Sequence, residues 1–115
     1  MELKKILVGL EGLKVKGDLN IDIKGIDKNS KEIKQGYLFV AIKGFTVDGH
    51  QFIESAIKNG ATAIMVEEGC NIKGINIPED ITIIMAKNTR EGLAISAANF
   101  YKNPSTKFKL IGVTG

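Results

Sequence analysis

The chain has 115 residues, which is room for one domain and hardly for two. Hydrophobic residues make up 43% and charged residues 25%, the proportions of an ordinary globular protein, and they exclude a disordered chain. The net charge of +3 is spread along the sequence, with a single arginine, Arg90, and no tryptophan. These features do not favour a nucleic-acid partner, since no basic and aromatic cluster is present to stack bases.

One cysteine, Cys70, excludes an intrachain disulfide framework and is too few for a cysteine zinc site. No apolar run approaches the roughly 20 residues that span a bilayer, and the apolar stretch near the N-terminus is too short for a signal peptide. We therefore expect a cytoplasmic protein with no membrane partner.

The first half of the chain predicts one helix and two strands. Apolar residues spaced three and four apart predict a short amphipathic helix over 2–10. Alternation of apolar and polar residues predicts a half-exposed strand over 15–26. The polar residues 27–32 are typical of a turn, and the continuous apolar run 37–42 predicts a buried central strand.

The next segment predicts a helix between two buried strands. Asp48 is the expected N-cap of this helix, and Asn59 with the following glycine is its expected end. Short apolar runs predict buried strands over 63–66 and 81–85. The glycine-containing residues 67–80 between them indicate a loop with an edge element.

The last helix is expected to begin at a cap formed by Asn88 or Thr89 and to end near Tyr101. The residues expected to pack inward are Leu93, Ala94, Ala97, Ala98 and Phe100. A final strand is expected over 108–113. Strands that alternate with helices predict a layered α/β domain.

Two glycine- or hydroxyl-containing segments are candidate anion sites. Residues 112–115 follow a predicted strand, as the start of a phosphate-binding loop does, but the chain stops before a Gly-Lys-Ser/Thr. The tip formed by Asn29, Ser30 and Lys31 could bind a phosphate or a base edge, although composition alone favours a solvated turn.

A third candidate is the segment 44–50, which places an aromatic ring and a hydroxyl just before a helix. The ring could stack on a planar base, and the helix N-terminus favours anions. The same segment could equally be an N-cap with Val47 packed back on the helix. His50 is better explained as an exposed structural histidine than as a general base.

The remaining reactive side chains form no self-sufficient catalytic group. Cys70 has the character of an incidental thiol. Glu67 and Glu68 have no partner at catalytic spacing, which favours a solvated charge pair. No catalytic residue and no metal ligand is therefore assigned.

Three blocks resemble the Mur ligases, which build peptidoglycan precursors. Residues 26–44 resemble the block Asp-Ser-Arg followed by Gly-x-Leu-Phe-Val-Ala-x-x-Gly. Residues 48–61 resemble the next block, Asp-Gly-His-x-Phe-Ile-x-x-Ala-x-x-x-Gly-Ala. Residues 88–115 are similar to the segment that leads into the ATP loop of the MurE-type enzymes.

The resemblance implies a mixed β-sheet flanked by helices, as in the N-terminal domain of this family. Residues 1–107 would be the UDP-sugar-binding domain, and 108–115 would be the first strand and start of a truncated ATP-binding central domain. Gly115 matches the first glycine of the Gly-Thr-Asn-Gly-Lys-Thr/Ser loop. ATP and magnesium are thus expected cofactors of the full-length enzyme, bound by residues beyond this fragment.

The resemblance also assigns substrate contacts. Ser30 matches a serine that contacts the UDP-sugar, and Lys28 matches a second contact position. The full set of expected binding residues is Lys28, Asn29, Ser30, Phe45, Thr46 and Val47. Asn29 stands where the family has Asp, and Lys31 where it has Arg, which keeps the charge but loses the bidentate fork. The segment 45–47 differs from the His-Gln-Ala of some members, so its contacts are expected to be mostly backbone.

The implied reaction is an ATP-dependent amide ligation. The carboxylate of UDP-N-acetylmuramoyl-L-alanyl-D-glutamate is phosphorylated, and an amine, meso-diaminopimelate or L-lysine, attacks the acyl phosphate. This fragment would hold the nucleotide and would be inactive alone. The alternatives are the N-terminal domain of a MurF-type ligase and a non-enzymatic nucleotide-binding module. The residues of this chain do not determine which amino acid is added, because the resemblance places that selection in the third domain of the ligase.

Overall fold

The computed structural model describes residues 1–42, 52–69, 72 and 74–101. Helices and strands alternate along this part of the chain. Their bounds are α1 (Leu3–Ile6), β1 (Lys14–Lys16), β2 (Gly25–Asp27), the 3₁₀ helix η1 (Ser30–Glu32), β3 (Tyr37–Val40), α2 (Ile53–Lys58), β4 (Ala63–Glu67), β5 (Thr82–Ala86) and α3 (Thr89–Tyr101).

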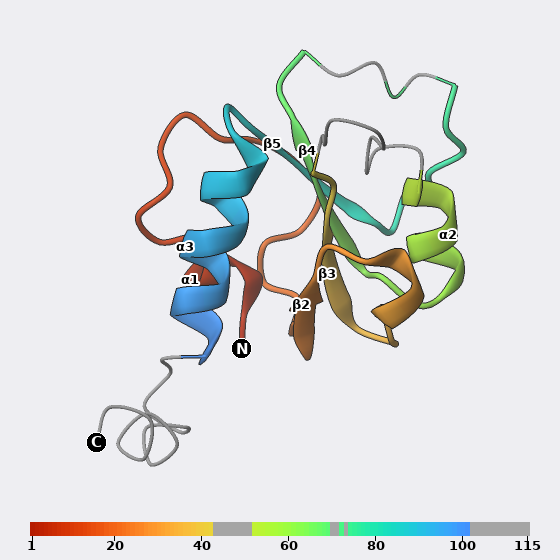
Figure 1. The fold of residues 1–115 in the computed structure, drawn as a ribbon, viewed down its shortest axis with the longest axis horizontal. Coiled ribbons are helices and arrows are strands. Elements are labelled where there is room, and N and C mark those ends of the chain that lie inside the picture. Colours follow the sequence, from red (N-terminus) through yellow and green to blue (C-terminus); the bar gives the residue numbers. More distant parts are fainter. Residues whose placement is uncertain (43–51, 70–71, 73, 102–115) are drawn as a thin grey trace.

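The strands form one sheet in the order β1-β5-β4-β3-β2. The strands β2, β3, β4 and β5 run parallel to one another, and β1 pairs antiparallel with β5. In Figure 1, α1 and α3 lie on one side of this sheet, and α2 lies on the other. The expected α/β fold with a mixed sheet flanked by helices is confirmed.

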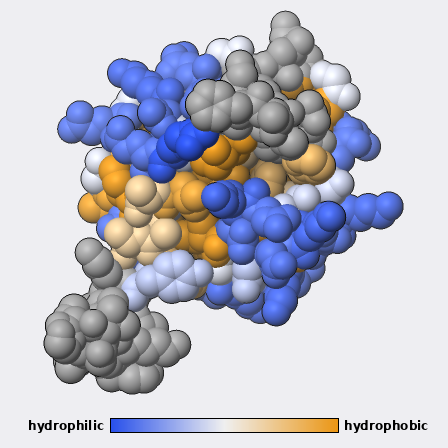
Figure 2. Space-filling view, in the orientation of Figure 1, coloured by the Kyte–Doolittle hydropathy of each residue, from blue (hydrophilic) through white to orange (hydrophobic). Residues whose placement is uncertain are grey.

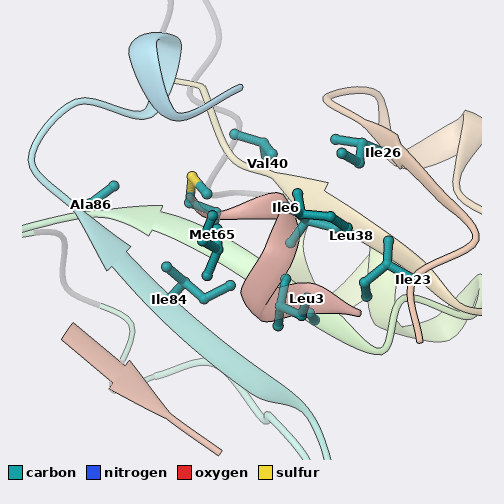
Figure 3. Close-up of a cluster of buried hydrophobic side chains, with 11 residues drawn as sticks. Leu3, Ile6, Ile23, Ile26, Leu38, Val40, Met65, Ile84 and Ala86 are labelled. Carbon is teal, nitrogen blue, oxygen red and sulfur yellow. The ribbon is translucent and has the colours of Figure 1, made fainter. Parts of the chain in front are cut away.

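The core has one apolar cluster on each face of the sheet. Neighbouring side chains of a strand point to opposite faces, so Leu38 and Val40 join one cluster and Phe39 joins the other. The first cluster packs under α1 and α3, and Figure 3 shows Leu3 and Ile6 directed at the strands. Burial on both faces explains why the central strands are continuous apolar runs.

The single strand expected over 15–26 is wrong. The segment forms β1 and β2, which lie at opposite edges of the sheet. Gly17, whose φ of +120° suits glycine, and a turn in which Asn20 N donates to Asp18 Oδ1 (2.8 Å) separate the two strands. The residues between them run along the N-terminus instead, where Leu3 N donates to Ile21 O at 2.9 Å.

Two further expectations need correction. The helix predicted over 2–10 is only α1, since the chain turns at Gly9 with a φ of +97°. The edge element expected within 67–80 is absent from the described residues there, which form no strand after Glu67. The edges are β1 and β2, and the apolar residues Ile72, Ile75 and Ile77 pack on the second cluster.

The bounds of α3 agree with the sequence, whereas its buried face differs in part. Asn88 Oδ1 accepts from the backbone N–H groups of Arg90 (2.9 Å) and Glu91 (3.1 Å), which makes Asn88 the N-cap. Ala94 is exposed, although it was expected to pack inward. The helix approaches β4 so closely that a Cβ on Gly92 would lie 2.5 Å from Met65 Sδ. Small residues therefore face the sheet, and Leu93 and Phe100 pack beside them.

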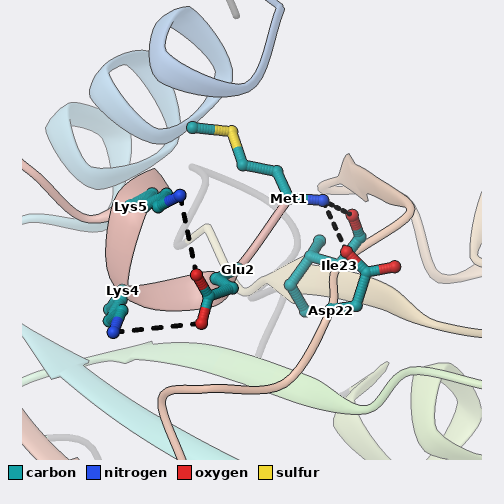
Figure 4. Close-up of polar contacts among 6 residues, drawn as sticks. All are labelled: Met1, Glu2, Lys4, Lys5, Asp22 and Ile23. Carbon is teal, nitrogen blue, oxygen red and sulfur yellow. Dashed lines mark hydrogen bonds and ion pairs between the residues drawn. The ribbon is translucent and has the colours of Figure 1, made fainter.

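The N-terminus is held by polar contacts to the segment before β2 (Figure 4). The Met1 ammonium donates to Asp22 Oδ1 at 2.6 Å and to Ile23 O at 3.2 Å. The hydrogen bond from the ammonium, and then its charge, lower the pKa of the Asp22 carboxyl. Glu2 forms exposed ion pairs with Lys4 and Lys5, which contribute little to stability.

This contact predicts a small acid-dependent loss of stability. Because the pKa of Asp22 is lower in the folded than in the unfolded chain, its contribution is complete above the ordinary Asp range and is lost as the pH falls through the lowered pKa. An NMR titration should find that the pKa of the Asp22 carboxyl is lower than that of an ordinary aspartate. N-terminal acetylation should return it towards the usual value, and an unchanged titration after acetylation would refute the contact.

Candidate functional site

The parallel strands bring several polar loops to one edge of the sheet. The carboxyl ends of β2, β3, β4 and β5 all lie there, because these strands run in one direction. In open α/β sheets, ligands bind outside the carboxyl ends of the strands. The candidate site is therefore sought among the residues that follow these strands.

The loop after β2 contains three of the predicted binding residues. Lys28 and Asn29 are exposed, and Ser30, the first residue of η1, is 7% exposed. Asp27 Oδ1 accepts from Asn29 N at 2.9 Å, and Asn29 Oδ1 accepts from Lys31 N at 3.0 Å. The solvated turn that composition favours is thus wrong for Ser30, which is held in an ordered, mostly buried turn.

The geometry explains the departure at Asn29. Its side-chain oxygen caps η1, and a carboxylate oxygen at the same position would accept the same backbone hydrogen bond. The exchange of Asp for Asn therefore preserves the cap while removing one negative charge from the loop.

The end of α2 packs against this loop. Asn59 Nδ2 donates to the Ser30 carbonyl at 2.8 Å, and Gly36 N donates to Gly60 O at 2.9 Å. From the sequence, Asn59 was expected only to end the helix. Its link to Ser30 crosses 29 residues of sequence, so no local pattern could have revealed it.

The solvated charge pair that was expected holds for Glu68, which is exposed, but not for Glu67, which is partly buried. Glu67 Oε1 accepts from the backbone N–H of Thr89 (3.2 Å) and from its hydroxyl (3.4 Å). Glu68 Oε1 lies 3.5 Å from Lys14 Nζ in an exposed ion pair. A carboxylate at the start of α3 is favourable because the helix dipole is positive there. Glu67 thus fastens α3 to the end of β4.

The other candidate residues fall outside the described part of the chain. These are Phe45, Thr46, Val47, Asp48, His50, Cys70 and Gly115, together with the strand expected over 108–113. Of the predicted binding residues, the structure thus brings together Lys28, Asn29 and Ser30, and it adds Asn59 beside them.

A separate pocket of about 270 Å³ lies beside the start of α3. Its lining includes Glu11, Lys87 and Asn88, and none of the predicted binding residues. It adjoins the end of β5, whereas the Ser30 loop follows β2, so β4 and β3 lie between the two. Figure 2 shows apolar residues in the middle of one face of the molecule, with hydrophilic areas to either side.

No group of three or more His, Cys, Asp or Glu side chains in the part of the chain that the structure describes is placed to hold a metal ion. No helix within it is long and apolar enough to cross a membrane.

Comparison with known proteins identifies the family. The model of the Mur ligase family, catalytic domain, matches residues 22–105, and the chain belongs to this family. The resemblance noted in the sequence is thereby confirmed.

Relatives with sequence similarity are named as ligases of one kind. The chain is 48% identical over all 115 residues to the UDP-N-acetylmuramoyl-L-alanyl-D-glutamate--2,6-diaminopimelate ligase of Clostridioides difficile. It is 47% identical over the same length to the enzyme of that name from Clostridium tetani, and 38% to that of Bacteroides fragilis. The chain spans 22–23% of the length of these relatives.

Solved structures with a similar fold include MurF ligases. The MurF ligase of Thermotoga maritima, in complex with ADP, is 34% identical and superposes with a TM-score of 0.52. That match covers 72% of this chain and 17% of the other. A MurF-type ligase of Acinetobacter baumannii has a TM-score of 0.63 over 82% of this chain and 20% of its own, with 23% identity, and shows the fold alone.

Proposed function

We propose that this chain is the UDP-sugar-binding domain of a ligase that adds the third peptide residue to UDP-N-acetylmuramoyl-L-alanyl-D-glutamate. The observation that carries the proposal is the 48% identity over all 115 residues to a relative named for that reaction. The MurF-type alternative is weaker, since the T. maritima MurF ligase is 34% identical over 72% of the chain. The relatives cited are named for 2,6-diaminopimelate, and we propose this amine.

The division of labour within the ligase follows from the expected boundaries. Residues 1–107 would hold the UDP-sugar, and 108–115 would lead into an ATP-binding domain whose phosphate loop begins at Gly115. ADP in the T. maritima ligase agrees with ATP as the cofactor. Magnesium is proposed as a second cofactor of the full-length ligase, on the family resemblance. The reaction would take place in the cytoplasm.

The residues after β2 would act by positioning. The Ser30 hydroxyl can donate to or accept from the UDP-sugar, and the Lys28 ammonium can approach its diphosphate. The hydrogen bonds of Asp27 and Asn29 hold this loop in one conformation before the substrate arrives. Binding the nucleotide far from the reacting carboxylate orients that carboxylate for the chemical step. The isolated chain is expected to show no ligase turnover.

The Ser30→Ala variant tests this assignment. Loss of one polar contact should weaken binding of the UDP-muramoyl dipeptide to the full-length ligase by roughly 0.5–1.5 kcal/mol, or about two- to tenfold in Kd. Titration calorimetry measures the change. The control is Ser55→Ala, which removes a hydroxyl from an exposed position of α2.

Three outcomes would contradict the proposal in different ways. Equal affinity in both serine variants would remove Ser30 from the site. A preference for the UDP-muramoyl tripeptide would favour the MurF-type alternative. Binding of UDP without ligase activity in the full-length protein would favour a non-enzymatic module.

A further inference from the structure

Asn59 is a polar link between the Ser30 loop and a different element of the fold. Its side-chain amide, at the end of α2, donates to the Ser30 carbonyl at 2.8 Å. The other hydrogen bonds that join this loop to described residues are local. Glu32 N donates to Asn29 O at 3.0 Å, and Ile33 N reaches Ser30 O only at 3.4 Å. A turn of three residues with such a long closing bond has little stability of its own.

The backbone of α2 does not require an asparagine at this position. Asn59 has a φ of −81° and a ψ of −6°, a right-handed conformation that most residues adopt. The left-handed residue that ends the helix is Gly60, with a φ of +120°. The helix end thus depends on Gly60. The side-chain amide of Asn59 is not needed to end the helix, and it donates to the loop at Ser30 instead.

The placement of Ser30 makes it sensitive to this contact. The residue is 7% exposed, so a small displacement of the loop would bury its hydroxyl or turn it away from a ligand. A site whose polar groups are already oriented loses less conformational entropy on binding. A fixed Ser30 carbonyl therefore fixes the start of η1 and the backbone position from which the hydroxyl projects.

We propose that Asn59 is a positioning residue that acts through Ser30 to hold the UDP-sugar-binding loop in its binding conformation. This inference rests on the proposed function, since it assumes that Ser30 contacts the substrate. Asn59 itself does not need to touch the ligand. Its hydrogen bond orders the loop before the substrate binds, so that less conformational entropy is lost on binding.

The kinetic test uses the full-length ligase that carries this domain. The Asn59→Ala variant should raise KM for the UDP-muramoyl dipeptide about three- to tenfold and leave kcat within about twofold. This split is expected because the nucleotide is held equally in the ground state and the transition state. Asn59→Asp keeps the shape but loses the donor, and it should also raise KM. The control is Asn20→Ala, which removes an exposed side-chain amide from the segment between β1 and β2. It should change neither KM nor kcat.

A second measurement needs no ligand. Hydrogen exchange of the amides in 28–33 should accelerate in Asn59→Ala and not in Asn20→Ala, with little change in the melting temperature. An unchanged KM and unchanged exchange would overturn the inference, as would a fall in kcat that accompanies general unfolding. Failure of the proposed function is recognised separately, because the unsubstituted ligase would then not use the UDP-muramoyl dipeptide at all.

Discussion

Replacing Phe39 by alanine is expected to lower the free energy of unfolding by about 3–5 kcal/mol. Phe39 lies in β3, is 0% exposed and has the largest fully buried side chain among the residues that the structure describes. It is paired with Ile64 of β4 in the middle of the sheet. The substitution would remove a ring from the cluster beneath α2, and the neighbouring strands could not close the cavity without breaking their pairing. Domains of this size are stable by about 5–15 kcal/mol, so this loss is a large part of the total.

Denaturant unfolding followed by far-ultraviolet circular dichroism measures the change. The matched control is Phe52→Ala, which removes the same ring at the start of α2, where the side chain is 39% exposed. That variant should lose less than about 1.5 kcal/mol. Equal losses in the two variants would mean that Phe39 is not the core residue described here.

Substitution of Gly60 by alanine is the second change with a large expected effect, at least about 3 kcal/mol. Two separate costs add at this position. The φ of +120° is strained for any residue with a Cβ, and the new Cβ would lie 2.6 Å from Gln35 Cα and 2.7 Å from Gln35 N. Both of these atoms are backbone, so no side-chain rotation relieves the overlap. The residues 34–36 would have to move, and the loop that precedes them would move with them.

A matched glycine separates the two costs. Gly69 also has a positive φ, +88°, but a Cβ there would meet no atom of the described residues within 4 Å. Gly69→Ala should therefore show the backbone strain alone, about 1–2 kcal/mol. The difference between the two variants in unfolding free energy reports the steric overlap at Gly60. If the Gly60→Ala and Gly69→Ala variants unfold at the same denaturant concentration, then Gly60 does not pack against the backbone of Gln35 as described.

The central part of the fold is predictable from local sequence. The strands β3 and β4 are buried on both faces, and β5 is buried on one face and partly covered on the other, so each contains a continuous apolar run. The start of α3 is equally local, since the Asn88 cap acts within three residues. The segment 15–26 fails for the opposite reason. Its alternation marks residues that pack on one side, and both a strand and an extended segment alongside the N-terminus satisfy that pattern.

The candidate site also has some features that local sequence can predict and others that it cannot. The turns made by Asp27 and Asn29 use side chains that bond two residues ahead, a pattern that short-range sequence can indicate. The burial of Ser30 and its link to Asn59 depend on how α2 returns to the sheet, and no spacing in the sequence encodes that contact. The assignment of Ser30 to the UDP-sugar came from family resemblance and stays a prediction.

The two outermost strands of the sheet also bear on how the domain resists association. Both β1 and β2 are only three residues long, and β1 carries Lys14 and Lys16 in exposed positions. Short, charged outer strands are poor templates for another chain, because an incoming strand would gain few hydrogen bonds and would meet positive charge. Release of β1 would expose the backbone of β5 along Ile83, Ile84 and Met85, an apolar stretch suited to aggregation. The three residues of β1 thus protect the protein from self-association as much as they extend its sheet.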